Sequence, residues 1–187
     1  MFLIRSEAAH DAEAVEALCN QGFGPERFTK TVYKLRHGDA HPDLSHVAVD
    51  PLNDQVLATL RFWQVQVGEE EVPALLLGPL AVDPALQGQG IGRALVGHGM
   101  QVARDLGESL VLVVGAPRYY QPFGFEPAQP YNLLLPGPVE QERFQLCPLN
   151  DKALGMLSRE RINHVSQRRG VRPGGSGRLN ADIGRAA

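Results

Sequence analysis

The strongest restriction on the fold of this chain is a glycine-rich turn, residues 87–93, that stands between two apolar patterns. An almost unbroken apolar run, 72–82, precedes the turn, and residues 91–106 follow it with apolar side chains at helical spacing before Gly107. The next segment, 109–114, is again apolar and rich in valine, as a buried strand would be. We therefore predict a strand, a helix and a second strand in this order.

The first of these strands carries the pair Gly78-Pro79 within its apolar run. Proline has no N–H to give to a sheet ladder, so the pair predicts a bulge at which the strand splays open. The helix that follows begins near Ile91, where its first amides are unpaired and carry partial positive charge. Glycines before it would let a bulky anion such as a pyrophosphate approach. The alternative is that these glycines serve only the turn.

The spacing of the glycines excludes two other kinds of nucleotide site. A P-loop needs Gly-Lys-Ser/Thr, whereas Gly92 is followed here by Arg93 and Ala94. The dinucleotide fingerprint needs Gly-x-Gly-x-x-Gly, whereas Gly88, Gly90 and Gly92 alternate. The turn therefore belongs to neither a P-loop nor a dinucleotide-binding unit.

The rest of the chain alternates between strand and helix patterns. Strands are predicted over residues 2–5, 45–49, 55–67, 131–135 and 143–149, and helical segments over 11–21, 26–37, 117–123 and, weakly, 151–167. Short turns separate the three strands between residues 45 and 82, so these should pair antiparallel. One compact domain is the default for 187 residues of which 43% are hydrophobic.

Three motifs in this order resemble the GNAT N-acetyltransferases. Residues 78–84 look like the splayed central strand of that family. Gln87, Gly90 and Gly92 match its acyl-CoA motif, Arg/Gln-x-x-Gly-x-Gly/Ala, and residues 119–125 resemble its aromatic-Tyr-x-x-aliphatic/aromatic-Gly-Phe segment. The resemblance implies an α/β (α+β) fold, with a mixed, mainly antiparallel central sheet flanked by helices and a splayed central strand.

The resemblance also implies a reaction and a set of site residues. A GNAT enzyme moves an acetyl group from acetyl-CoA to a primary amine by direct attack, without a metal. Tyr120 would be the general acid that protonates the departing thiolate; the alternative is an aromatic side chain that packs under the cofactor. The residues expected to bind acetyl-CoA are Leu80, Ala81, Val82, Gln87, Gly88, Gln89, Gly90, Ile91, Gly92, Arg93, Tyr119 and Phe123.

One position departs from the family pattern. Many members have Asn where this chain has Gly115, at the end of the strand before the tyrosines, which leaves the detailed mechanism open. No base for the amine is assigned: Glu71 would act through water or be a solvated turn residue, and His98 is expected on the helix surface. The identity of the acceptor, the acyl-chain preference and a possible homodimer also stay open. Acceptor contacts are expected around residues 23–45 and in late loops.

Two functions of other classes remain as alternatives. A non-catalytic acyl-CoA sensor would keep the glycine turn and lose the transfer chemistry. A nucleic-acid-associated protein would act through the basic residues that follow Leu157, although acidic residues outnumber basic ones before that point. The acidic body should attract a cationic amine rather than nucleic acid. We predict an acyltransferase domain over residues 1–149, and a C-terminal helix with a basic, flexible tail over 150–187.

The chain has neither a long apolar stretch nor a secretory start, so we expect a cytoplasmic protein that does not enter membranes. Cys19 and Cys147 lack the spacing of metal ligands, and both are expected in the core.

Overall fold

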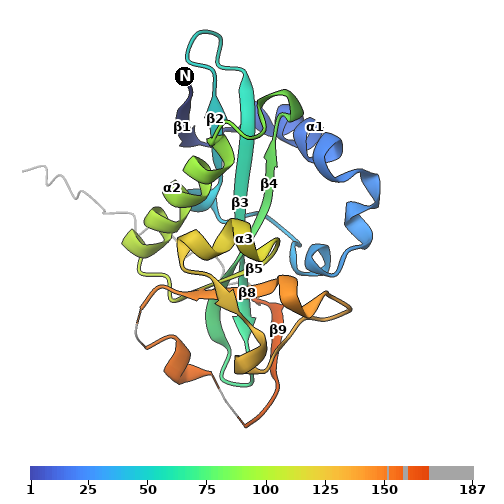
Figure 1. The fold of residues 1–187 in the computed structure, drawn as a ribbon, viewed down its shortest axis with the longest axis vertical. Helices are drawn as coiled ribbons and strands as arrows, with labels where there is room; N and C mark the ends of the chain where they lie inside the picture. Colours follow the sequence, from blue (N-terminus) through green and yellow to red (C-terminus); the bar gives the residue numbers. More distant parts are fainter. Residues whose placement is uncertain (151, 158–159, 169–187) are drawn as a thin grey trace, which may run out of the picture.

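The computed structural model describes residues 1–150, 152–157 and 160–168 (Figure 1). Its strands are β1 (Leu3–Ser6), β2 (His46–Val49), β3 (Val56–Val67), β4 (Val72–Val82), β5 (Leu110–Val114), β6 (Glu126–Pro127), β7 (Leu133–Leu134), β8 (Phe144–Pro148) and β9 (Asn163–Gln167). Its α-helices are α1 (Ala12–Phe23), α2 (Ile91–Asp105) and α3 (Pro117–Tyr120), and short 3-10 turns join many of these elements. Within the described ranges, no helix has the length and apolar character that crossing a bilayer requires.

The strands form one sheet in the order β1-β2-β3-β4-β5-β8-β6, and β9 joins it by pairing with the end of β3. β1 to β4 pair antiparallel, as the short turns predicted. β4 and β5 run parallel, because the chain returns through α2 before it forms β5. The predicted mixed, mainly antiparallel sheet is confirmed.

A bulge interrupts β4 at the predicted place. Leu77 pairs with Phe62 and Leu80 pairs with Leu60, so two residues of β4 fit opposite one residue of β3. The extra residue shifts the alternation of side chains along the strand. As a result Leu80 stays on the same face of the sheet as Leu77, and Ala81 turns to the opposite face.

Helices cover the sheet on both faces, with α2 and α1 on either side of β3 and β4 (Figure 1). α2 packs its apolar side against the sheet, where Leu95 and Met100 are fully buried, and α1 packs Val15 and Cys19 against the other face. Fully burying an aliphatic side chain of this size contributes about 1.5–3 kcal/mol, so these faces fix where the helices lie. Cys19 and Cys147 are both free and buried, as predicted.

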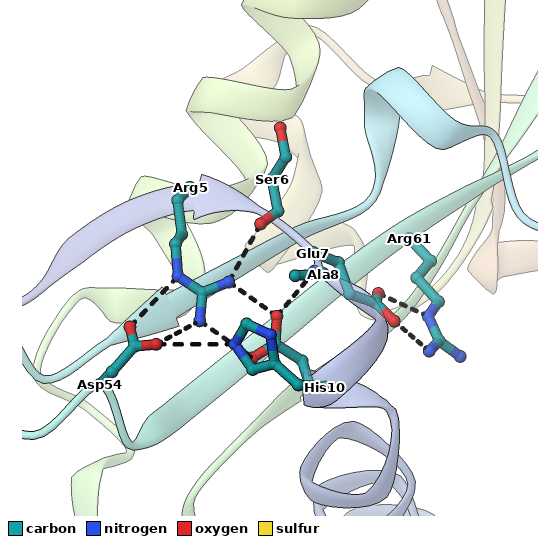
Figure 2. A network of polar contacts seen from close by, with 8 residues as sticks. Arg5, Ser6, Glu7, Ala8, His10, Asp54 and Arg61 are labelled. Atoms are coloured by element: carbon teal, nitrogen blue, oxygen red, sulfur yellow. Dashed lines mark hydrogen bonds and ion pairs between the residues drawn. The ribbon is translucent and has the colours of Figure 1, made fainter.

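A polar network holds β1 to the loop between β2 and β3 (Figure 2). Arg5 donates to both carboxylate oxygens of Asp11, at 2.7 and 2.9 Å, and to those of Asp54, at 3.2 and 3.0 Å. Asp11 is buried, and hydrogen bonds from Arg5 hold the pKa of its carboxyl below the usual value. Glu7, which follows β1, accepts two hydrogen bonds from Arg61 of β3. These pairs fix the first strand and the start of α1 against the sheet.

The helix predicted over residues 26–37 is wrong in form. The segment contains two separate 3-10 turns, Pro25–Thr29 and Thr31–Leu35, with one extended residue between them. The hydroxyl of Thr31 donates to the carbonyl of Pro138 at 2.7 Å. This bond holds the start of the second turn against a segment far away in the sequence, which a local apolar pattern cannot predict.

The helix predicted over residues 151–167 is also wrong for the part that the structure describes. A short 3-10 turn, Leu154–Met156, is followed by β9, in which Asn163 and Val165 are buried and His164 is exposed. β9 pairs with the end of β3 and with β7, so the sheet continues past residue 149. The arginine-rich tail predicted to be flexible lies, from residue 169, outside the described residues, and the domain boundary at 149 stays a prediction.

A buried histidine in β2 makes the stability of the fold sensitive to acid. Both ring nitrogens of His46 are buried without a hydrogen-bond partner in the described part of the chain, and its ring meets that of His98 at 4.6 Å between centroids. Burial, with a smaller contribution from His98, lowers the pKa of His46 to about 4. In the unfolded chain the pKa of the same imidazole is about 6.5. Its contribution to stability is therefore complete above that pH and is lost as the pH falls toward the folded-state value.

We expect His46→Phe to flatten this dependence, because it keeps a buried ring and removes the titration. The loss in the free energy of unfolding between neutral and acidic pH should be smaller than in the wild type by about 2–3 kcal/mol. Urea denaturation at several pH values measures this difference. His37→Gln, at an exposed position, is the control and should follow the wild-type curve. Parallel curves for His46→Phe and the wild type would contradict the assignment.

Candidate active site

The sheet opens between β4 and β5, as predicted from the pair Gly78-Pro79. The two strands pair near the start of β5, and beyond those positions no described strand pairs with that edge of β4. A cavity of about 860 Å³ lies in the opening. Its walls are residues 77–80 of β4 and 113–116 at the end of β5, and parts of 23–36 and 138–143 cover it. We call it the larger cavity.

A smaller cavity of about 370 Å³ lies at the start of α2. It is lined by Leu80, Val82, Leu86, Gln87, Gly88, Gly90, Ile91, Gly92, Arg93 and Tyr119. Leu80 and Tyr119 also line the larger cavity, so the two cavities adjoin there. A ligand that occupied both would lie along the unpaired edge of β4.

The backbone of the glycine turn leaves room for such a ligand. Gly90 immediately precedes α2 with a φ of 85°, a left-handed conformation that favours glycine. A Cβ added at Gly88 or at Gly90 would meet no atom within 4 Å, so the space beside the turn is open. No acidic residue occupies the first turn of α2. The free amides and partial positive charge of this helix start therefore suit an anion.

Gly92 serves a different purpose from the two glycines before it. A Cβ at this position would come within 2.7 Å of the hydroxyl oxygen of Tyr119 and 3.2 Å of a methyl group of Val82. Glycine lets the tyrosine lie against the first turn of α2, where its ring centroid is 5.9 Å from the guanidinium of Arg93. Gly92 thus allows the close packing of the wall that the two cavities share.

Past its bulge, β4 offers backbone groups to the cavities. Its hydrogen bonds to β3 continue on one side, whereas the side toward β5 is unpaired within the described residues. An unpaired edge of this kind can pair with an extended chain that contains amides, as it would with an added strand. Residues 78–82 therefore fit a ligand with an amide-containing arm.

Two adjacent tyrosines lie where β5 gives way to α3. The rings of Tyr119 and Tyr120 meet edge to face, with centroids 5.0 Å apart, and Tyr120 also packs against Phe125. Tyr120 is buried and lines the larger cavity, next to Tyr119, which lines both cavities. Burial raises the pKa of Tyr120 well above the usual phenol value. Its hydroxyl is therefore protonated at neutral pH, as a proton donor must be.

The packing of Tyr120 explains the departure at Gly115. A Cβ at Gly115 would collide with the ring of Tyr120, so Asn at this position would displace the tyrosine. The carbonyl of Gly115 accepts a hydrogen bond from the buried side chain of Gln145 at 3.1 Å. Glycine at the end of β5 therefore belongs to the placement of Tyr120 in this chain.

Most of the residues predicted to bind the cofactor come together in the smaller cavity, and three do not line either cavity. Ala81 faces the core under α1 because the bulge shifts the alternation of β4. Gln89 lines a separate hollow near the N-terminus, and Phe123 packs on Tyr119 with centroids 6.2 Å apart. The side chain of Gln87 donates to the carbonyl of Val82 at 3.4 Å, which supports the turn from within.

Neither residue considered as a base reaches the cavities. Glu71 lies in the turn between β3 and β4, where it accepts a hydrogen bond from Gln66 at 3.0 Å. His98 lies in α2, with its ring against that of His46. The described residues contain no group of three or more His, Cys, Asp or Glu side chains that could hold a metal ion.

Comparisons with known proteins identify the family. Residues 12–125 match the model of the acetyltransferase (GNAT) family. Over 153 residues the chain is 36% identical to the uncharacterized N-acetyltransferase YhbS of Escherichia coli K12, which covers 82% of this chain and 90% of that protein. The chain belongs to the GNAT acetyltransferase family.

Solved GNAT structures share the fold. The crystal structure of the GNAT family N-acetyltransferase YhbS from Escherichia coli, in complex with CoA, has a TM-score of 0.75 and 32% identity over 89% of each chain. A GNAT family acetyltransferase from Brucella melitensis, in complex with acetyl-CoA, has a TM-score of 0.64 and 26% identity over 89% of this chain and 95% of that one. The protein is thus an acyltransferase with the fold that its motifs predicted.

The GNAT motifs did not reveal the side chains that cover the larger cavity. Tyr33, Arg36, Val139 and Arg143 come from the 3-10 turns and from the loop before β8. Acceptor contacts were expected around 23–45 and in late loops, but these segments carry no periodic pattern that singles out individual residues.

Proposed function

We propose that this GNAT protein binds acetyl-CoA along both cavities and transfers its acetyl group to a primary amine. The observation that carries the proposal is the meeting of the two cavities at Leu80 and Tyr119. It connects a helix start suited to a pyrophosphate with an opening in the sheet large enough for a second substrate. The CoA and acetyl-CoA complexes of the two solved relatives support the choice of cofactor.

In this proposal the binding groups are mainly backbone. The amides of residues 89–93 hold the pyrophosphate at the start of α2, and Arg93 adds a positive side chain beside it. The unpaired edge of residues 80–82 pairs with the amides of the pantetheine arm. Backbone binding explains why Ala81 can contribute although its side chain faces away from the cavities.

The chemistry requires positioning, charge stabilisation and one proton. Acetyl-CoA supplies a thioester that is activated toward attack by an amine. Backbone N–H groups of β4 near Leu80 orient the carbonyl and stabilise the charge that develops on its oxygen. Tyr120, kept protonated by burial, donates its proton to the departing sulfur. We assign no base, so the amine has to be neutral when it attacks. After the attack its nitrogen releases one proton to water, and Tyr120 regains a proton from water, so that the products are the amide and the CoA thiol.

The proposal is tested by incubating the protein with acetyl-CoA and a panel of primary amines. We expect release of free thiol that depends on the amine, and a product whose mass has increased by one acetyl group. Calorimetric binding of acetyl-CoA without thiol release for any amine would favour the non-catalytic sensor instead. Failure to bind acetyl-CoA would reject the proposal. Cytoplasmic location and a homodimer stay predictions.

A further inference from the structure

The larger cavity contains an arginine that the acetyl-transfer chemistry does not use. Arg36 follows the second 3-10 turn, and its guanidinium lies over the ring of Tyr33, 4.7 Å from the centroid. Its Nη2 is 3.5 Å from the carbonyl oxygen of Leu77 and would be 2.7 Å from a Cβ added at Gly78. Arg36 therefore lies beside the bulge of β4, at the place where the sheet opens.

Arg36 has no anionic partner among the described residues. Its Nε is buried and makes no hydrogen bond there, and no carboxylate in that part of the chain lies within ion-pair distance. Burial lowers the pKa of Arg36 to about 10, so the group is still charged at neutral pH. A buried charge without an anionic partner is costly, and the contacts of Arg36 with Tyr33 and with the carbonyl of Leu77 offset only part of this cost.

Another arginine of the same cavity shows what a structural pairing looks like. Arg27 is buried too, but it donates to Glu16 at 2.7 Å, to the carbonyl of Gly24 at 3.1 Å and to the side chain of Asn20. Its donors are used within the protein. Arg36 differs because its Nε makes no hydrogen bond within the described residues and its Nη2 makes one long contact with a carbonyl.

The cavity around Arg36 is positive, although the chain as a whole carries a net charge of -3. Its positively charged lining residues are Arg27, which is paired with Glu16, and Lys30, Arg36 and Arg143; Glu140 is negatively charged. A cationic amine without a counter-charge would be repelled mainly by the buried charge of Arg36, which solvent screens poorly, and less by the exposed Lys30 and Arg143. An acceptor that carries an anion together with its amine would be bound.

We infer, on the basis of the proposed acetyl transfer, that the acceptor is a small amine that also bears a carboxylate, and that Arg36 binds this carboxylate. The guanidinium of Arg36, which lines the cavity, would donate to the carboxylate oxygens. Val32, Val113 and Val139 give the same cavity an apolar wall for the remainder of the acceptor. Arg36 thus selects the acceptor, whereas the start of α2 binds the cofactor.

The experiment compares three matched sets of amines with acetyl-CoA and the full chain. These are the standard amino acids, the primary amides of the same amino acids, and the corresponding amines that lack the carboxyl group. The amide keeps the shape of the acid and removes its charge. Its amine also loses a proton more readily than the amine of the acid, so a preference for the acid cannot come from the reactivity of the amine. We expect at least one amino acid to be acetylated about 10- to 100-fold more efficiently than its amide, the range that a charged hydrogen-bonded pair provides.

Arg36→Gln then tests whether this residue causes the preference. Its kcat/KM should fall by about 10- to 100-fold for the preferred amino acid and change little for the matching amide, which reports the folding and the chemistry of the variant. Lys34→Gln removes the same charge from an exposed position of the same segment and should keep the wild-type preference. The affinity for acetyl-CoA should be unchanged in both variants.

Three results would overturn the inference. The first is that no amino acid has a higher kcat/KM than its amide with the wild-type protein. The second is that Arg36→Gln keeps the preference for the amino acid. The third is that Arg36→Gln loses activity equally with the amino acid and with its amide. The last result would mean that Arg36 acts on the thioester or on the fold. In each case, thiol release with amines that lack a carboxylate would leave the proposed acetyl transfer intact. If no amine caused thiol release and acetyl-CoA did not bind, both the acetyl transfer and the role of Arg36 would be rejected.

Discussion

Replacing Tyr120 with Phe is expected to lower turnover by about 10²–10⁴-fold, the usual contribution of a general acid, and to leave the affinity for acetyl-CoA unchanged. The variant keeps the aromatic ring, so the contacts with Tyr119 and Phe125 remain. It removes the hydroxyl whose proton is needed as charge develops on the sulfur. A group needed at that stage affects kcat rather than binding. Steady-state thiol release and calorimetry measure the two quantities.

The neighbouring hydroxyl provides the comparison. Tyr119→Phe should lower turnover much less than Tyr120→Phe, because the Tyr119 hydroxyl lies against Gly92 in the wall between the cavities. If turnover of Tyr120→Phe stayed within about threefold of the wild type, Tyr120 would have no role as the acid.

The pH profile gives a further check on Tyr120. An acid acts while it holds its proton, and burial raises the pKa of this phenol. Wild-type kcat should therefore show no falling limb up to about pH 10, where an ordinary phenol ionises. A falling limb below that pH in the wild type that is absent in Tyr120→Phe would show that the phenol ionises too early.

The parts of the site that the sequence predicted are those in which neighbouring residues determine the geometry. Glycine at position 90 allows the left-handed turn before α2, and Pro79 cannot join a sheet ladder, so the turn and the bulge are local consequences of residue type. The order of strand, helix and strand follows from periodicities within single segments. For this reason the smaller cavity contains most of the residues expected there.

The parts that the sequence did not predict depend on contacts between distant segments. β9 forms a strand because the end of β3 and β7 offer it hydrogen bonds, and its own pattern is too short to decide between strand and helix. Thr31, at the start of the second of two 3-10 turns that replace a predicted helix, donates a hydrogen bond to Pro138, 107 positions away. Arg36 lies in the larger cavity because of this arrangement, and no motif marks it.

Gly90→Asp is expected to weaken the binding of acetyl-CoA at least about tenfold relative to Gly90→Asn, and this pair of variants isolates charge as the cause. Asn and Asp have nearly the same shape, both tolerate a left-handed backbone, and both accept hydrogen bonds from helix amides. A side chain at Gly90 enters open space, and the strain of a left-handed backbone is common to both variants, so it does not contribute to the difference between them.

The aspartate would place a negative charge where the pyrophosphate is proposed to lie, and two like charges about 4 Å apart repel by roughly 1–4 kcal/mol near a protein surface. Calorimetry with acetyl-CoA measures the two affinities, and thermal unfolding confirms that both variants are folded. Added salt should reduce the difference, because exposed charges are screened. Equal affinities for the two variants would place the pyrophosphate away from the start of α2, and the glycines would then serve only the turn.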